Sequence, residues 1–376
     1  MRKTRRGKLK QQKYLLIGGT FSLLLLLSVG YAAFTTTITL NAKGNVHPNT
    51  YTVDRLKSTI GTCGNGEFIA DPNEQGRYVY RGADPCNYLT LNNETWRIMS
   101  IESDNTLKII REDSIGDIPF DLGRTSVIAG ITENGSDTGT RYSTADFCYS
   151  SSNDGCKVWG SKDTMRNSSG VLLKDVSGDG TAKMQRALTD STAYDLPDDE
   201  AYLNIYLNGG TYAGVNVAGW YQTWSNTLSD TVKSYIDDNH LWNVGLVSYT
   251  SGQLTATDIA QEKALKWQGR VGLMTASEYV RASTNSSCTG VYGYGTASAC
   301  YNDGSSHNYL RKTIPQFMLS SQSISNSYSV FGVTPYNLVN IKASTNGGVR
   351  PVLYLSSNVK LVGDGTTGSK FQIKTS

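Results

Sequence analysis

The segment RYVYRGADPCNYLTLNNETWRIMSIESDNTLKIIR, residues 77–111, decides the fold that this sequence predicts. It contains four short runs rich in β-branched and aromatic residues, and residues that favour turns separate them. This pattern is typical of an antiparallel meander, in which Trp96 would point into the core. The strands predicted here are Arg77–Tyr80, Tyr88–Leu91, Thr95–Ile101 and Thr106–Arg111.

The rest of the sequence also favours strands and ordered loops over helical bundles. Only 18% of the residues are charged, and 23 tyrosines stand against 8 phenylalanines, a composition that suits sheets and turns. We therefore expect a β-rich α+β fold. Short helices are predicted at Asp54–Ile60, Asp198–Leu207 and Ser229–Asn239, buried strands at Val244–Tyr249, Gly269–Met274 and Val349–Leu355, and a closing hairpin from Val359–Val362 and Phe371–Ile373.

The amino-terminal segment predicts insertion into a membrane. Seven cations occur in residues 1–13 and no acid precedes Asp54, so this flank should stay in the cytoplasm while the following chain is exported. Residues 14–34 form an apolar run that would reach about 30 Å as a helix, enough to span a bilayer. Small residues around Ala32 suit a cleavage site equally well, so both a retained anchor and a cleaved signal fit this segment.

These features divide the chain into four parts: a basic flank (1–13), a transmembrane or signal segment (14–34), a strand or stalk linker (35–60) and an extracellular domain (61–376). Without the seven leading cations, 28 Lys and Arg stand against 32 Asp and Glu, a net charge of −4. This acidic balance argues against a nucleic-acid partner.

Six cysteines fall into three pairs that are close in sequence. In an exported chain this spacing favours disulfides, with free thiols as the second interpretation. The sequence does not select one of the fifteen connectivities that six cysteines allow. A metal site is disfavoured because there is no Cys-x-x-Cys or His-x-x-x-His spacing. The neighbouring pairs are Cys63 with Cys86, Cys148 with Cys156 and Cys288 with Cys300.

Five landmarks follow one another along the chain: Thr95–Ile98, Tyr202–Gly209, Gly272–Tyr279, Phe317–Ser320 and Gly348–Leu355. Together they resemble an uncharacterised family of bacterial extracellular domains. That family is similar to the formylglycine-generating-enzyme (sulfatase-modifying-factor) and C-type-lectin-like group, which implies an irregular fold with long loops. The resemblance covers about residues 76–362. Separately, Gly30–Val46 resembles the export segment of Gram-positive surface proteins.

The resemblance does not carry enzyme chemistry with it. The generating enzyme uses paired active-site cysteines and copper, whereas Cys288 and Cys300 enclose Gly, Tyr and Ser residues typical of a stapled loop. A nucleophile elbow, a phosphate loop and a His-Glu-x-x-His helix are also absent from the sequence. We therefore expect no catalysis and no cofactor.

Arg350 lies among apolar residues of the Gly-Val-Arg-Pro landmark and needs a partner if it is buried. Glu278, in another landmark, is the acid expected to pair with it, and both residues would then be structural, as would Trp96. A ligand-binding arginine is the second interpretation. Pro351 lacks an amide donor, so its strand should be an edge or begin at a bulge.

Two weaker patterns point to binding sites. Trp220, Tyr221 and Trp224 would form an exposed aromatic platform for a sugar or peptide, although such a cluster is more often part of a core. Residues 175–181 carry oxygens at the spacing of a calcium loop, but Arg186 occupies the position of the required bidentate acid, which favours a plain turn. The candidate calcium ligands are Asp175, Ser177, Asp179 and Thr181.

The leading functional hypothesis is an exported or membrane-anchored surface protein. Its lectin-like domain would bind an extracellular carbohydrate or protein through loops on a rigid scaffold, without catalysis. The alternative is a structural envelope or pilus-like subunit that assembles through the β-rich segment after Ala33. A sulfatase-modifying-factor-like enzyme is the third hypothesis.

Overall fold

The computed structural model describes residues 50–122, 127–128, 131–132, 155–176, 178, 180–185, 188, 191–247, 256–286, 306–322, 329–334 and 338–375. They all belong to one compact unit, Thr50–Ser376. The basic flank, the apolar run and residues 35–49 of the linker lie outside the described residues. Within the described ranges, no helix is both long and apolar enough to cross a bilayer.

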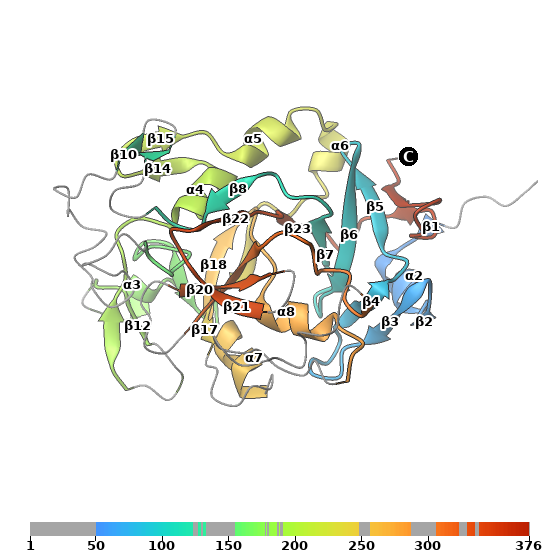
Figure 1. Ribbon diagram of the computed structural model, residues 1–376, viewed down its shortest axis with the longest axis horizontal. Helices are drawn as coiled ribbons and strands as arrows, with labels where there is room; N and C mark the ends of the chain where they lie inside the picture. Colours follow the sequence, from blue (N-terminus) through green and yellow to red (C-terminus); the bar gives the residue numbers. More distant parts are fainter. Residues whose placement is uncertain are drawn as a thin grey trace, which may run out of the picture. The chain divides into compact units, whose positions relative to one another are not determined.

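A ten-stranded sheet is built around β6 (Glu94–Ile101) (Figure 1). It confirms the predicted meander for the three later strands, whereas the first one, β4 (Tyr78–Asp84), pairs with β6 and so departs from a simple meander order. One edge of β6 pairs with β7 (Leu107–Arg111), and the other pairs first with β5 (Tyr88–Leu91) and then with β4. The remaining strands of this sheet are β1 (Thr50–Tyr51), β2 (Gly61–Thr62), β3 (Asn65–Ala70), β23 (Val352–Leu355), β24 (Leu361–Val362) and β25 (Phe371–Ile373).

The turn between β5 and β6 shows why this meander forms. Asn92 and Asn93 both have positive φ, 56° and 59°, which a tight two-residue hairpin of type I′ requires and which Asn adopts more readily than most residues. The turn places Leu91 opposite Glu94. With that register fixed, Trp96 is fully buried, as expected.

A second sheet of six strands has β19 (Gln316–Gln322) at its centre. Its other strands are β8 (Asp117–Pro119), β17 (Leu246–Val247), β20 (Ser329–Val333), β21 (Leu338–Lys342) and β22 (Asn346–Gly348). A three-stranded sheet contains β11 (Met165–Asn167), β16 (His240–Asn243) and β18 (Leu265–Gly269). The two-stranded sheets are β9 (Val127–Ile128) with β10 (Ile131–Thr132), β12 (Lys183–Gln185) with β13 (Ala193–Asp195), and β14 (Gly210–Tyr212) with β15 (Val215–Val217).

The helices of the described residues are short, which confirms a β-rich α+β architecture. They are α2 (Val53–Lys57), α3 (Leu173–Val176), α4 (Tyr202–Asn208), α5 (Trp220–Ser225), α6 (Asp230–Lys233), α7 (Ala256–Lys263) and α8 (Ala276–Arg281). Most buried apolar side chains form one large cluster to which both large sheets contribute. The structure therefore has a single main core.

The helix predicted at Asp198–Leu207 begins later than expected. α4 starts at Tyr202 after an N-cap alanine without a side-chain hydrogen bond, so its first turn lacks the predicted acids. A distant carboxylate takes their place: Asp121 Oδ1 accepts a hydrogen bond from the amide of Tyr202 at 3.0 Å. The negative group favoured at a helix N-terminus is thus supplied by tertiary contact.

Two further predictions are corrected by long-range pairing. The helix expected at Ser229–Asn239 ends as α6 at Lys233, because Ile236 forms a β-bridge with Leu355. The strand expected at Gly269–Met274 is reduced to one bridge between Gly272 and Val352. In contrast, the hairpin of β24 and β25 is confirmed. β23 begins directly after Pro351 and, among the strands of its sheet, pairs with β7, so it is the edge strand that the missing amide donor predicts.

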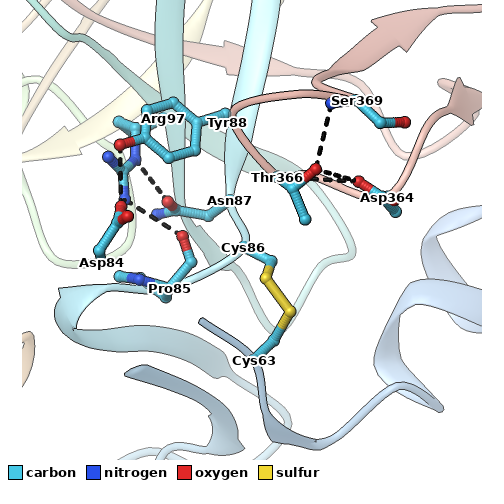
Figure 2. Close-up of a disulfide and its surroundings, with 10 residues drawn as sticks. All are labelled: Cys63, Asp84, Pro85, Cys86, Asn87, Tyr88, Arg97, Asp364, Thr366 and Ser369. Atoms are coloured by element: carbon cyan, nitrogen blue, oxygen red, sulfur yellow. Dashed lines mark hydrogen bonds and ion pairs between the residues drawn. A yellow bond between two sulfur atoms is a disulfide. The ribbon is translucent and has the colours of Figure 1, made fainter. Parts of the chain in front are cut away.

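The disulfide between Cys63 and Cys86 confirms one of the three expected pairs (Figure 2). It closes a loop of sequence separation 23 that contains β3 and β4. Cys156 is disulfide-bonded as well, while Cys148, Cys288 and Cys300 lie outside the described residues. The first pair therefore staples the edge of the ten-stranded sheet.

The segment beside this disulfide holds a buried arginine (Figure 2). Arg97 Nε donates to Asn87 Oδ1 at 2.5 Å, and its Nη2 donates to Asp84 Oδ1 at 3.1 Å. The guanidinium also lies 3.6 Å from the ring centroid of Tyr88, a favourable cation–π geometry. The disulfide thus anchors the segment that satisfies a charge in the core.

Candidate functional site

A cluster of charged side chains lies inside the protein, where α8 meets β4, β6 and β7. Arg77 is at its centre, with a side chain only 3% exposed. Its guanidinium is 2.7 Å from Asp71, 3.0 Å from Glu102, 3.5 Å from Glu278 and 3.9 Å from Glu74. A buried cation with this many carboxylates in reach is fully compensated.

The strand register explains how Arg77 meets its partners. Tyr78 of β4 is opposite Ile101 of β6, so the preceding Arg77 lies beside the following Glu102. The amide of Asp71 donates to the carbonyl of Arg77 at 2.8 Å, which closes the connection between β3 and β4. Local pairing therefore brings both carboxylates to one guanidinium.

Glu278 joins the cluster through the cap of α8. Thr275 and Glu278 form a capping box, in which Glu278 Oε2 accepts the Thr275 amide at 2.8 Å. The other oxygen, Oε1, accepts from Lys108 Nζ at 2.6 Å. Lys108 also lies 5.1 Å from the ring centroids of Trp242 and Tyr354. One carboxylate thus fixes both a helix start and a buried lysine.

The cluster is balanced in charge. Arg281 contacts Asp71 at 2.7 Å and Glu74 at 3.3 Å, and Lys263 forms an ion pair with Glu74. The ion cluster, as we call it below, consists of four cations (Arg77, Lys108, Lys263, Arg281) and four acids (Asp71, Glu74, Glu102, Glu278).

The pKa values of the acids show that the cations dominate their surroundings. Burial alone would raise the pKa of Glu102, but Arg77 and Lys108 outweigh it and hold this pKa at about 2. Burial likewise opposes ionisation of Asp71, and Arg281 and Arg77 still lower its pKa. Both carboxylates are therefore ionised at neutral pH and serve as fixed partners, not as proton donors.

A groove of about 420 Å³ lies against the ion cluster. Asp71 and Arg281 belong to both the groove wall and the cluster. The apolar part of the lining is Ile69, Pro72, Val79 and Val280, and the uncharged polar part is Asn73, Ser283, Thr284, Asn285 and Ser286. A concave site of this size with mixed lining is typical of small-ligand binding.

Among the described residues, each charged side chain that lines the groove has an oppositely charged partner. Arg81 pairs with Glu67 at 2.5 Å, and Arg281 pairs with Asp71 at 2.7 Å. A strongly charged ligand would have to compete with these pairs. The groove therefore suits a neutral ligand that offers hydroxyl or amide groups.

Arg350 is buried, but its expected partner was wrong. Its guanidinium lies 3.5 Å from Glu112 and donates to the carbonyls of Arg111 (2.7 Å) and Leu310 (3.0 Å). Glu278 is instead occupied by Lys108 and Arg77. Sequence alone could not separate two acids that both lie far from Arg350 along the chain.

A second cluster of charged side chains surrounds Glu112. Arg350, Lys312 and Arg97 approach this one carboxylate, at 3.5, 2.5 and 4.0 Å. Burial lowers the pKa of Arg350 to about 10, and Glu112 counteracts this only in part. Burial also lowers the pKa of Lys312, and Arg350 adds to that effect.

The aromatic platform expected from Trp220, Tyr221 and Trp224 is mostly part of the core. Tyr221 and Trp224 are buried, and Trp224 lies 5.4 Å from Trp96, ring centroid to centroid. Trp224 Nε1 donates to Glu94 at 2.9 Å. Only Trp220 is partly exposed, stacked on Trp224 at 5.2 Å. These residues lie together but do not present an exposed platform.

Two of the four candidate calcium ligands lie within the described residues. Asp175 lies in α3 and Thr181 follows Gly180, whereas Ser177 and Asp179 are outside the described residues. In the described part of the chain, no group of three or more His, Cys, Asp or Glu side chains could hold a metal ion. The calcium interpretation therefore gains no support from the described geometry.

Comparison of the chain with protein-family models, with curated proteins and with solved structures finds no match.

Sequence analysis missed the ion cluster and the groove. One signal was present: a charged residue inside a buried strand, as with Lys108 between Leu107 and Ile109, requires a partner. The capping box of Thr275 and Glu278 was a second signal. Neither could show which residues meet, because they come from distant parts of the chain.

Proposed function

We propose that this chain is an exported or membrane-anchored surface protein whose lectin-like domain binds a neutral carbohydrate, without catalysis. The observation that carries the proposal is the groove of about 420 Å³ beside α8. It combines hydroxyl and amide side chains with apolar walls, and the charged side chains of its described lining are paired.

This lining matches the chemistry of a sugar. Hydroxyl and amide groups of Asn73, Thr284 and Asn285 offer donors and acceptors to sugar hydroxyls. Val79 and Val280 offer apolar surface to the C–H faces of a ring. The ion cluster beneath the groove restrains Arg281 and Asp71, so a ligand would meet a wall that is already ordered.

Two features of the chain support export: its amino-terminal segment and its disulfide. The cationic flank and apolar run of residues 1–34 have the pattern of an export segment. The disulfide between Cys63 and Cys86 requires an oxidising compartment to persist, and Cys63 is exposed to reductants. A surface location satisfies both conditions.

The proposal is tested by incubating the full chain, purified in detergent micelles, with an array of neutral and charged glycans. We expect binding to neutral glycans with an affinity that changes little between about 50 and 500 mM salt, since screening weakens only charge attraction. Absence of binding across the array, or binding to charged glycans alone, contradicts the proposal.

Paired variants test whether the groove is the site. Asn73→Ala and Thr284→Val remove polar groups from its lining and should weaken binding about tenfold each, the effect of one lost hydrogen bond of about 1.4 kcal/mol. Asn239→Ala and Thr231→Val make the same changes at exposed positions outside the groove. Equal losses in both pairs would place the binding site elsewhere.

A further inference from the structure

A small cavity lies between the ion cluster and the segment that follows residue 305. The polar residues of its lining are Arg77, Tyr80, Glu278, Arg281 and Tyr309. The centre of a water molecule has about 10 Å³ in which to lie there, close to the space that one ordered water occupies. The cavity is thus large enough for one water and too small for a larger ligand.

Tyr309, one of the residues that line the cavity, has an unsatisfied hydroxyl. The residue is 5% exposed, and its hydroxyl is buried without a hydrogen-bond partner. An orphaned buried hydroxyl costs about 1 to 3 kcal/mol in desolvation, so native structures seldom retain one. A partner that fits the cavity would remove this cost.

Arg77 and Glu278 have capacity to share such a partner. Arg77 Nη2 lies 3.5 Å from Glu278 Oε1, longer than a direct charge-assisted hydrogen bond. A water molecule can donate two hydrogen bonds and accept two, which matches a carboxylate, a guanidinium and a hydroxyl together.

We propose that this cavity is a binding site for one ordered water, which bridges the Tyr309 hydroxyl to Glu278 and Arg77. The water completes the hydrogen bonding of the ion cluster. It also ties the segment of Tyr309 to α8. The proposal is independent of any ligand in the groove.

The variant Tyr309→Phe tests the proposal through the sign of a shift in melting temperature. If the hydroxyl bonds a water, its removal breaks that bond and Tm of the full chain should fall by about 2 °C. If the hydroxyl is an orphan, its removal relieves the desolvation cost and Tm should rise, which overturns the proposal. Tyr78→Phe, in β4 and outside the cavity lining, measures the effect of losing a tyrosine hydroxyl by itself.

A high-resolution crystal structure of the full chain gives the second test. We expect a water within about 3 Å of Tyr309 Oη and of Glu278 or Arg77. A dry cavity would overturn the proposal, even if Tyr309→Phe lowered Tm.

Discussion

Lys108 and Glu278 lie 170 residues apart in the sequence, yet Lys108 Nζ is 2.6 Å from Glu278 Oε1 in the protein interior. Lys108 belongs to the meander and Glu278 to the first turn of α8. This contact joins the amino-terminal sheet to the helix that borders the groove.

Replacing Lys108 by Met should destabilise the protein by about 3 kcal/mol, because it removes the closest partner of a buried carboxylate. Chemical denaturation of the full chain measures the loss. Lys162→Met is the matched control, since Lys162 is exposed and its partner Asp198 is partly exposed, so that this ion pair should contribute less than about 1 kcal/mol. Similar losses of stability in the two variants would show that the buried ion pair contributes no more than the exposed one.

Acid should destabilise the protein through Glu102. Its pKa of about 2 lies below the ordinary value of 4.5 because Arg77 and Lys108 outweigh the effect of burial. The stability from this shift, about 3 kcal/mol, is therefore present above pH 4.5 and is lost as the pH falls from 4.5 towards 2. Glu102→Gln should flatten the stability profile in this window. An unchanged slope would mean that another group controls acid unfolding.

His240 should give a second pH dependence at higher pH. Burial lowers its pKa below 6.5, although the hydrogen bond to Asp237 opposes the shift and nearby Lys108 adds to it. The unfolded state then binds more protons, so stability is complete above about pH 6.5 and decreases as the pH falls below it. His240→Phe should keep the stacking on Tyr354, whose ring centroid is 3.4 Å away, and remove this slope. Persistence of the slope would refute the assignment.

Arg350→Lys should destabilise the protein by about 2 kcal/mol, although the variant keeps the positive charge. The guanidinium donates to the carbonyls of Arg111 and Leu310 and to Gln316, and a single ammonium group does not match this fork. Thermal unfolding measures the loss. Arg81→Lys, at a partly exposed arginine that pairs with Glu67, should change stability by less than about 1 kcal/mol. If Arg350→Lys left the stability unchanged, the positive charge alone would be sufficient at this position.

Removing the disulfide with Cys63→Ser and Cys86→Ser together should cost about 3 kcal/mol, the loop-closure entropy for a loop of this length. Reductant should cause at least this loss in the unmodified chain, because Cys156 is disulfide-bonded too. Denaturation with and without reductant measures both effects. Unchanged stability in the double variant would indicate that β3 and β4 need no staple.

Features that depend on neighbouring residues were predicted correctly, whereas features that depend on distant contacts were not. The alternating pattern of residues 77–111 and the turn at Asn92 and Asn93 predicted four strands correctly. The helix at Ser229–Asn239 was wrong from Lys233 onwards, because pairing of Ile236 with Leu355 prevails over the helical pattern. Local sequence propensity therefore determines the secondary structure of a segment where no distant strand pairs with it.

The candidate site shows the same division. Arg350 was correctly expected to need a partner, but the expected acid, Glu278, was wrong, and Glu112 takes its place. The aromatic residues at 220–224 could be core or platform, and burial of Trp224 against Trp96 decided for the core. The groove could not be predicted, since its walls come from residues 69–81 and 280–286.

The sequence by itself determined the β-rich class, the four strands within residues 77–111 and the edge strand that follows Pro351. Each of these depends on side-chain periodicity, turn geometry or a missing donor, which act within a few residues. Only the tertiary structure decided the partners of Lys108 and Arg350, the end of α6 and the existence of the groove. These depend on which distant surfaces pack together, and burial then requires every charge to find the partner that packing brings within reach.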